Sequence, residues 1–457
     1  MTRRLRGILA LAGLVAAACV AHRPPAAPAA PIDRTALAAR VRDEFLFAWH
    51  AYQRFASGHD ELNPVSRTPH DWYPPAVFEM TPIDAVDTMA IMGLTTEAAE
   101  ARTTILDHLS FDVDVSVQVF EVNIRILGAL LTQYQTTGDA RFLDLAQDLG
   151  RRLLPAFRSP TGMPYRFVNL RTGATGGPVS NPAEVGTLIL EFGTLSKITG
   201  QPEFYDAAKR ALLELAHRRD PATGLVGSAI DVRTGAWTDT SSHIGGGIDS
   251  YYEYALKCQR LFGDADCATI WRDGIAAVNR YLADAGPGGL WYGVADMRTG
   301  RRTATIYGSL QAFFPAVLAL GGDVPRAERL QDSGDRMWQL NGVEPEELDY
   351  RTMRVTDARY ELRPEIIESA YYLLHDTHDP KYLEMGRTFL DGLVACCRTD
   401  TGYTTLTDVR TKAKGDRQHS FLLAETFKYL YLIFQPDAVD FDRVTFNTEA
   451  HPLTRTW

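Results

Sequence analysis

The chain has 457 residues, of which 45% are hydrophobic, 10% aromatic and 23% charged. This composition supports a large apolar core and excludes both a disordered chain and a mini-protein. The net charge of −10 argues against nucleic-acid binding, because phosphate backbones attract clustered Lys and Arg and the chain has no such stripe. The five cysteines form no CxxC pair, which excludes a zinc ribbon.

Residues 1–19 have the layout of an export signal. Three arginines in MTRRLRG precede the apolar run ILALAGLVAAAC, which is too short to span a bilayer. The run ends in small residues and Cys19, a pattern that resembles a bacterial lipobox. We expect either lipidation of Cys19 or plain signal-peptide cleavage, and so a periplasmic protein or a membrane-anchored lipoprotein. Residues 20–34 are rich in Pro and Ala and predict an extended tether.

Two pairs of cysteines follow the tether. Cys258 and Cys267 could pair in an oxidising compartment, whereas Cys396 and Cys397 are adjacent and are expected to be free thiols. No Asn-x-Ser/Thr sequon with a permitted middle residue occurs, which is consistent with a bacterial exported protein.

A repeated helix–turn–helix pattern fills the rest of the chain. Each repeat has an apolar, aromatic-rich segment, a turn and a more amphipathic segment, which predicts an inner and an outer helix. The turns lie 62, 63, 59, 56 and 58 residues apart. They are centred on Asp139, Gln201, Asp264, Asp323, Asp379 and Asp437.

Units of about 60 residues divide residues 35–457 into roughly seven helical hairpins. Such hairpins favour one all-α domain in which paired helices close into a toroid. An open solenoid is the alternative, but no terminal unit looks like a polar cap.

Four carboxylates lie at one end of the predicted inner ring, 14 to 18 residues before their turns: Glu121, Glu184, Asp249 and Glu365. In a closed barrel they would ring the mouth of the cavity, beside the acids of GHDEL and IDAVD. An acid in the first turn of a helix also complements the helix dipole, which is the structural explanation for any one of them. The set as a whole suggests glycoside hydrolysis by paired acids or a site for a hard cation.

Several segments resemble the signature blocks of the class I α-mannosidases, glycoside hydrolase family 47. The likeness spans residues 40–455, and its blocks are GHDELNPVSR, TPIDAVDTMAIMGL, FEVNIRILGALL, GGIDSYYEYALK, LRPEIIESAYYL, SFLLAETFKYLYLIF and FNTEAHPL. The resemblance implies an (α/α)7 barrel closed by a C-terminal segment that enters it. It also implies removal of terminal α-1,2-linked mannose with inversion, using Ca2+.

The resemblance assigns three catalytic carboxylates. Glu121 matches the general acid, acting through a water, and Glu365 matches the general base that activates the attacking water. Asp249 matches a third catalytic carboxylate, for which an acid role is also considered. Inversion requires this division, because one group protonates the leaving oxygen while another deprotonates water on the opposite face of the sugar.

The resemblance also assigns a metal ligand and a substrate pocket. Thr448 matches the protein ligand to calcium, through its hydroxyl and its backbone carbonyl. Among the other acids, Glu368, Glu425 and Glu449 match those that hold calcium-bound waters. The remaining substrate-binding residues are expected to be Glu61, Glu184, Arg125, Arg363 and Phe421, with Phe421 as the aromatic floor under the sugar.

Four residues, at three places in the chain, depart from the family pattern. Ser309 stands where the family commonly has a sugar-facing histidine, and Ala312 stands where it commonly has a disulfide cysteine. Gln418-His419 replaces Met-Glu before the SFLLAET block. The loss of one imidazole bears on affinity and substrate range more than on the type of reaction.

The sequence therefore predicts an exo-acting, calcium-dependent, inverting α-1,2-mannosidase, a hydrolase of carbohydrate metabolism or N-glycan processing, acting on high-mannose glycans or mannans. We expect a monomer with no nucleic-acid partner. One alternative is a mannose-glycan-binding, lectin-like protein on the same fold, against which the complete acid/base set argues. Another is an (α/α) barrel glycosidase or lyase that acts on a different sugar.

Overall fold

The computed structural model describes residues 32–286 and 288–457. The predicted signal and lipidation site, with Cys19, and most of the predicted tether lie outside these residues. The first helix begins at Arg34, and Arg34–Trp457 forms one compact unit.

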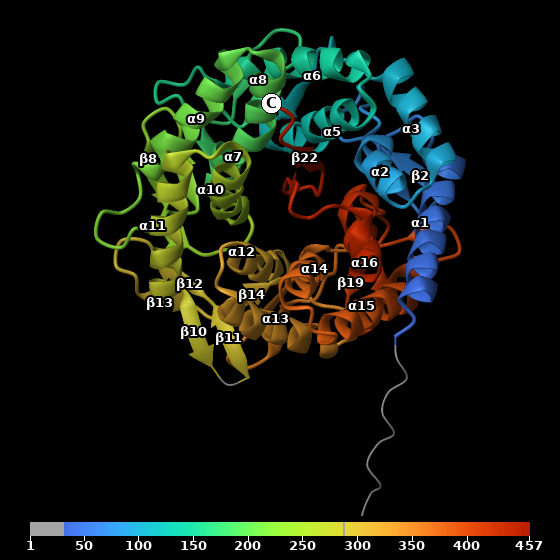
Figure 1. Cartoon of the computed structure of the whole chain (residues 1–457). Coiled ribbons are helices and arrows are strands. Elements are labelled where there is room, and N and C mark those ends of the chain that lie inside the picture. The colour runs from blue at the N-terminus through green and yellow to red at the C-terminus, as the bar shows by residue number, and fades with distance from the viewer. Residues whose placement is uncertain (1–31, 287) are drawn as a thin grey trace, which may run out of the picture. The chain divides into compact units, whose positions relative to one another are not determined.

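Outer and inner helices alternate along this unit and form two concentric rings (Figure 1). The outer ring consists of α1 (Arg34–Ala56), α3 (Thr95–His108), α6 (Ala140–Leu153), α9 (Pro202–Ala216), α11 (Ala265–Tyr281), α13 (Val324–Gln339) and α15 (Lys381–Cys397). The inner ring consists of α2 (Met80–Ile91), α5 (Gly128–Thr137), α8 (Ile189–Thr199), α10 (Asp249–Phe262), α12 (Phe314–Leu320), α14 (Glu365–Thr377) and α16 (Phe427–Phe434). Shorter helical segments are α4 (Val119–Val122), α7 (Pro182–Gly186), the π-helical η1 (Asn123–Leu127) and η4 (Leu422–Thr426), and the 3-10 segments η2 (Leu154–Phe157), η3 (Ser309–Phe313) and η5 (Pro436–Ala438).

Hydrophobic periodicity separates the two rings. The outer helix α6 buries one stripe, at Phe142, Ala146, Leu149 and Leu153, and exposes charges on its other face. The inner helix α8 is buried along its first eight residues, as an apolar segment surrounded by other helices should be. The two kinds of segment in the sequence therefore predict the two rings correctly.

The two ends of the helical series meet and close the ring. The Arg34 guanidinium on α1 donates to the Phe434 carbonyl on α16 at 3.2 Å. Further along the same two helices, the rings of Phe45 and Phe427 pack edge to face, 6.3 Å between centroids. The fold is thus the closed (α/α)7 barrel that the sequence predicts, and the open solenoid is excluded.

One predicted turn has a different continuation. Five of the six turns join an inner helix to the next outer helix, but the turn at Asp437 follows α16 and leads to η5 and the C-terminal strands instead. The outer helix beside α16 is α1, from the other end of the chain. A seventh turn, at Gly93 between α2 and α3, has a positive φ of 71° and no acidic residue to mark it.

Short strands occupy the loops that lead from outer to inner helices, and two more form the C-terminal hairpin after α16. They form two- and three-stranded antiparallel sheets. The strands are β1 (Glu61–Asn63), β2 (Thr68–His70), β3 (Ser116–Gln118), β4 (Phe167–Asn169), β5 (Thr175–Gly176), β6 (Val179–Ser180), β7 (Ala229–Asp231), β8 (Ala236–Asp239), β9 (Ser241–Ser242), β10 (Ala283–Gly286), β11 (Gly289–Tyr292), β12 (Val294–Asp296), β13 (Arg302–Ala304), β14 (Ile306–Gly308), β15 (Glu347–Asp349), β16 (Arg354–Asp357), β17 (Arg398–Thr399), β18 (Gly402–Tyr403), β19 (Leu406–Asp408), β20 (Ala413–Lys414), β21 (Val444–Phe446) and β22 (Pro452–Thr454).

These strands fix where the inner helices begin. Four strands that lead into inner segments, β3, β6, β9 and β14, each pair with a hairpin strand of the following loop. For example, Gln118 pairs with Phe167, and α4 starts at the next residue, Val119. The hydrogen-bonded loops therefore hold the first turns of the inner helices, where the predicted acids lie.

The C-terminal hairpin enters the barrel. Strands β21 and β22 pair from Val444 with Thr454 to Phe446 with Pro452, and the turn between them lies at the centre of the ring (Figure 1). The buried ammonium of Lys428 donates to the Ala450 carbonyl at 2.6 Å. This is the closing segment that the family resemblance implies.

Candidate active site

A cavity of about 300 Å³ lies at the N-terminal ends of the inner helices. Eleven of the twelve predicted site residues line it: Glu121, Arg125, Glu184, Asp249, Arg363, Glu365, Glu368, Phe421, Glu425, Thr448 and Glu449. The predicted residue Glu61 does not. Its buried carboxylate accepts from the Ser420 amide at 3.0 Å and pairs with Arg417 at 3.0 Å, so it supports the segment that carries Phe421.

One wall is organised by a buried arginine. Arg125 Nε donates to Glu121 at 3.0 Å, and its Nη1 contacts Asp84 at 3.3 Å and Glu449. Arg125 lies in the π-helical η1, four residues after Glu121. Because the guanidinium is nearly fully buried, its three carboxylate partners offset the cost of removing its charge from water.

The opposite wall carries the predicted base. Glu365 is the first residue of α14, and burial raises its pKa to about 7, although the neighbouring Arg363 opposes the rise. Arg363 is held by Glu346 through contacts of 3.1 to 3.3 Å. This pairing leaves the Glu365 carboxyl free of a direct ion pair, and its Oε2 has no hydrogen-bond partner among the described residues.

Asp249 begins α10 on a third side of the cavity. Burial raises its pKa to about 7, against the opposing hydrogen bond from the Ser250 amide at 2.8 Å. Glu253, one helical turn later, also lines the cavity and forms a buried ion pair with Lys257. We did not predict Glu253 from the sequence, although its i, i+4 spacing from Asp249 puts both acids on one helix face.

Glu184 lies in the first turn of α7. Its carboxylate accepts from Gln118 Nε2 at 2.8 Å and Ser180 Oγ at 2.9 Å, and it pairs with Arg166 at 2.9 Å. Burial still raises the pKa of Glu184. Gln118 lines the cavity too, which gives the site a neutral hydrogen-bonding group that sequence reasoning missed.

The C-terminal turn provides the inner end of the cavity. Thr448 and Glu449 line it there, close to Glu368 and Glu425. Burial raises the pKa of Glu368 to about 8 and raises the pKa of Glu425 and Glu449 as well. In all, eight carboxyl groups and two arginines line the cavity. This excess of carboxylate oxygens, which can act as metal ligands, over positive charges fits a hard divalent cation such as calcium.

Phe421 forms an aromatic surface of the cavity. The guanidinium carbons of Arg125 and Arg363 each lie 5.8 Å from its ring centroid. The imidazole of His419 stacks on the ring at 4.9 Å with an interplanar angle of 13°. The Glu61 and Glu361 carboxylates flank His419 and raise its pKa against the opposing effect of burial.

The two other departures from the family pattern lie beside this site. Ser309 is buried and lines a neighbouring hollow of about 470 Å³, which shares Gly246 and Leu310 with the catalytic cavity. Its hydroxyl has no hydrogen-bond partner among the described residues. Ala312 is part of the hydrophobic core.

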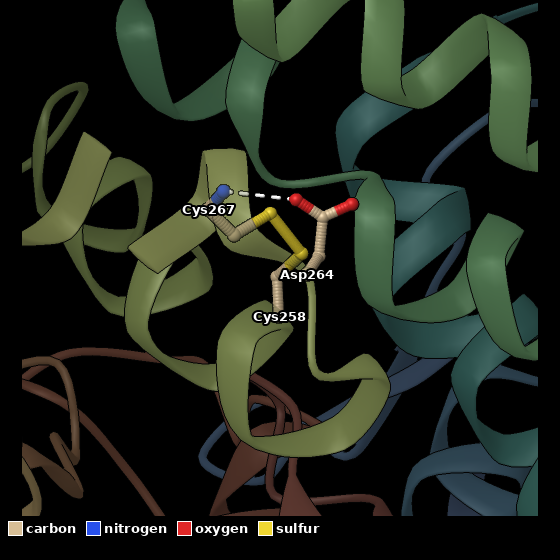
Figure 2. Close-up of side chains that lie close together, drawn as sticks. All are labelled: Cys258, Asp264 and Cys267. Atoms are coloured by element: carbon tan, nitrogen blue, oxygen red, sulfur yellow. Dashed lines mark hydrogen bonds between the residues drawn. A yellow bond between two sulfur atoms is a disulfide. The ribbon is translucent and has the colours of Figure 1, made fainter. Parts of the chain in front are cut away.

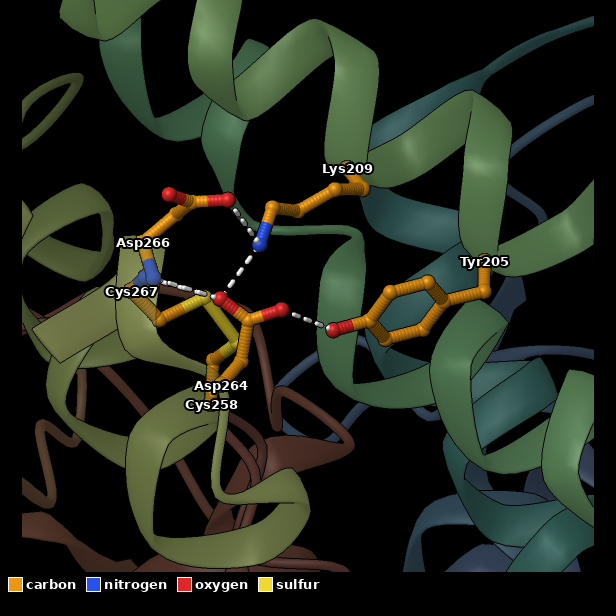
Figure 3. The surroundings of a disulfide bond; sticks show 6 residues. All are labelled: Tyr205, Lys209, Cys258, Asp264, Asp266 and Cys267. Carbon is orange, nitrogen blue, oxygen red and sulfur yellow. Dashed lines mark hydrogen bonds and ion pairs between the residues drawn. A yellow bond between two sulfur atoms is a disulfide. The ribbon is translucent and has the colours of Figure 1, made fainter.

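The described part of the chain contains one compact trio of potential metal-binding side chains: Cys258, Asp264 and Cys267. Figure 2 shows that its two sulfur atoms are bonded to each other, as a disulfide that joins α10 to α11. Asp264 accepts from the Cys267 amide at 3.0 Å and contacts Tyr205 and Lys209 of α9 (Figure 3). The trio is therefore a disulfide beside the Asp264 N-cap of α11, and the pairing that the sequence left open is present.

Comparisons with known proteins agree with this geometry. The family model for glycosyl hydrolase family 47 matches residues 44–455. Alpha-mannosidase I MNS5 from Arabidopsis thaliana is 37% identical over 445 residues, 91% of this chain and 76% of that protein. The human endoplasmic reticulum mannosyl-oligosaccharide 1,2-alpha-mannosidase is 36% identical, over 95% of this chain and 67% of its own length.

A solved structure supports the same conclusion. The α-1,2-mannosidase from Trichoderma reesei superposes with a TM-score of 0.85 and 27% identity, covering 92% of this chain and 99% of that one. The closed helical barrel and its acid-lined cavity thus define a glycoside hydrolase. The chain belongs to glycosyl hydrolase family 47, the family of the α-mannosidases to which it is similar.

Proposed function

We propose that this protein is an exo-acting, calcium-dependent, inverting α-1,2-mannosidase that removes terminal mannose from high-mannose glycans or mannans. The observation that carries the proposal is the cavity itself, in which paired carboxyl groups surround a small space with the Thr448 turn at its inner end. A pocket closed by the chain's own C-terminal segment suits the end of a glycan rather than its middle. The activities in the names of the similar proteins support the linkage and the sugar.

Glu365 is the general base in this proposal. With a pKa of about 7 it is about half ionised in neutral solution, and its ionised form is basic enough to take a proton from water. Arg363, fixed by Glu346, stabilises the ionised form without forming a direct hydrogen bond to it. The attacking water must therefore approach the sugar from the α14 side of the cavity.

The proton donor is one of two carboxyl groups. Glu121, oriented by Arg125, acts through a water in the scheme that the resemblance implies. Asp249 is the second candidate. Its pKa of about 7 leaves it half protonated at neutral pH, so it could donate its proton directly, without an intervening water. Separate acid and base groups on different inner helices are what inversion requires.

Thr448 would hold the calcium through its hydroxyl and carbonyl oxygens, and Glu368, Glu425 and Glu449 would hold its waters. When bound, the cation supplies coordination positions for two hydroxyl groups of the terminal mannose and so helps to distort the ring. Phe421 packs under the sugar, while Arg125 and Arg363 keep the surrounding carboxylates in place. The remaining binding energy is then available for distortion toward the transition state.

The proposed base is tested by Glu365→Gln, which keeps the shape of the side chain and removes its basicity. We expect hydrolysis of α-1,2-mannobiose to fall by about 10³-fold or more, while binding of the disaccharide is retained. Calorimetric titration of the variant measures binding independently of turnover. A variant with near wild-type rates contradicts the assignment, and binding without hydrolysis by the wild type favours the lectin-like alternative.

We also propose that the protein is exported, through residues 1–19, and acts as a monomer. The Cys258–Cys267 disulfide suits an oxidising compartment. No helix in the described residues is long and apolar enough to cross a membrane. Fractionation of cells that express wild type and Cys19→Ala tests the lipid anchor, because loss of the anchor should move the protein from the membrane to the soluble fraction.

A further inference from the structure

The backbone of Thr448 is held by a tyrosine on an inner helix. The Thr448 amide donates to the hydroxyl of Tyr254 at 3.2 Å. That hydroxyl in turn donates to Glu191 Oε1 at 2.7 Å. Since a carboxylate oxygen can only accept, the tyrosine proton points at Glu191 and a lone pair is left for the Thr448 amide.

A second arm from the same glutamate holds the next peptide plane. Asn447 Nδ2 donates to Glu191 Oε1 and to the Ile124 carbonyl, both at 2.8 Å. Its Oδ1 accepts from the Glu449 amide at 3.0 Å. The peptide planes before and after Thr448 are therefore both pinned, one through Tyr254 and the other through Asn447.

The anchor of both arms is a buried carboxyl group. Glu191 is 0% exposed, and three side-chain donors point at its two oxygens, the third being Asn123 Nδ2 at 2.8 Å from Oε2. Burial raises the pKa of Glu191, and these hydrogen bonds oppose the rise. A carboxyl group that accepts from three side-chain donors is a rigid hub for both arms rather than a passive core residue.

This arrangement leaves two oxygens of Thr448 available. Among the described residues, no hydrogen bond uses its hydroxyl or its carbonyl oxygen, although Thr448 lines the cavity. These two atoms are the ones that the proposed function assigns to calcium. The tyrosine and the glutamate contact neither of them directly.

We infer that Tyr254 and Glu191 are positioning residues for the cation site, which orient Thr448 so that both of its oxygens face the cavity. The inference rests on the proposed calcium dependence and deepens it. A ligand pair fixed in advance costs little entropy on binding, so loss of the brace should weaken calcium affinity first. Turnover should then fall only in proportion to the fraction of the protein that has lost its calcium.

The same helix offers a matched control. Tyr252 is also fully buried on α10, but its hydroxyl has no hydrogen-bond partner among the described residues. Tyr254→Phe and Tyr252→Phe therefore remove the same atom from two equally buried positions on one helix. Only the first removes a contact to Thr448.

Calorimetric titration of calcium into the metal-free protein tests the inference. We expect Tyr254→Phe to raise the dissociation constant by about tenfold and Tyr252→Phe to change it by less than about twofold. Glu191→Gln leaves the three donors with one acceptor oxygen in place of two, so it should weaken binding as well, and it serves if the first variant does not fold. Thermal unfolding without calcium reports any purely structural loss.

The outcomes are distinct. Unchanged calcium affinity in a folded Tyr254→Phe, with only the melting temperature lowered, overturns the inference and leaves the proposed function intact. Equal weakening by Tyr252→Phe also overturns it, because the effect is then not specific to the brace. A wild-type protein that binds no calcium overturns both the inference and the calcium dependence of the proposed function.

Discussion

At the scale of single residues, burial gives several acids unusual proton affinities. Asp249 and Glu365 begin inner helices whose dipoles favour ionisation, yet burial raises the pKa of each to about 7. Perturbed carboxyl groups on facing helices are the pattern of an acid/base pair. Arg363 opposes the rise in pKa at both groups, while the charge of Asp249 raises the pKa of Glu365, so ionisation of Asp249 favours a proton on Glu365.

The identity of the proton donor can be decided by leaving-group dependence. If Asp249 is the acid, Asp249→Asn should lower the hydrolysis of α-1,2-mannobiose by at least about 10²-fold, because the glycosidic oxygen then departs unprotonated. The same variant should retain most of its activity on α-mannosyl fluoride, whose leaving group needs no proton. If Glu121→Gln shows this rescue and Asp249→Asn does not, the donor is Glu121.

Residue types near the site could be predicted, but their partners could not. The positions of Glu121, Glu184, Asp249 and Glu365 before their turns indicate the correct end of the barrel. Which of the acids face the cavity depends on neighbours far along the chain. Glu61 shows this, because Arg417 and the Ser420 amide engage its carboxylate outside the cavity.

At the scale of elements, two π-helical segments shape the site. Arg125 lies in η1 and Glu425 in η4, and both segments interrupt inner helices at the cavity. A π-turn adds a residue to the helical ladder and reorients the side chains within it, and for this reason such turns are common at functional sites. Apolar periodicity predicts these helices but carries no signal for the extra residue.

A hairpin motif that the helical repeat does not reveal recurs around the barrel. In each copy an Asp or Asn side chain accepts from the amide two residues later, and the residue four positions on has a positive φ. The copies are NLRTG at Asn169, DVRTG at Asp231, DMRTG at Asp296, DYRTM at Asp349 and DVRTK at Asp408. The spacing was visible in the sequence, but an all-helical interpretation gave no reason to look for it.

The fit of the C-terminal hairpin can be tested at Gly128 on α5. A Cβ at this position would lie 2.6 Å from Asn447 Nδ2 and 3.1 Å from the His451 ring. We expect Gly128→Ala to destabilise the protein by about 2 kcal/mol and to weaken calcium binding, because Asn447 must move.

Gly334→Ala on α13 is the control, since its Cβ would meet Ile366 at an ordinary 3.4 Å. Helix propensity predicts a neutral to stabilising effect there, up to about 1 kcal/mol. Chemical denaturation measures both variants. Equal effects at the two glycines would contradict the proposed packing of the hairpin.

At the scale of the whole molecule, the ring brings distant segments together. The repeat period could be read from the sequence because each unit must bury its inner helix against its neighbours. The sequence predicts that the ring closes, but it does not predict that α1 pairs with α16, since this pairing joins residues 400 positions apart with no local signal. For the same reason the turn at Asp437 is not followed by an outer helix: α1, from the other end of the chain, takes that place beside α16.

The crowded carboxyl groups should make the stability of the metal-free protein depend on pH. The folded pKa values of Asp249, Glu365 and Glu368 are about 7, 7 and 8, above their ordinary values. The folded state therefore binds these protons more tightly than the unfolded state, and the resulting stability is lost as pH rises from about 5 to 8.

We expect the melting temperature of the metal-free protein to fall by a few degrees over that interval, and calcium to restore it most at the upper end. Differential scanning calorimetry with and without a chelator measures both effects. Glu368→Gln should flatten the dependence. A melting temperature that rises with pH in the absence of metal would contradict the burial argument.

The most direct test of the central claim follows the hydrolysis of α-1,2-mannobiose by proton NMR, with calcium present and after its removal by EDTA. We expect β-mannose to appear first, before mutarotation, and hydrolysis to stop with EDTA and return with calcium. Initial release of α-mannose would contradict inversion. No release of mannose by the calcium-loaded wild type would contradict the proposed mannosidase activity itself.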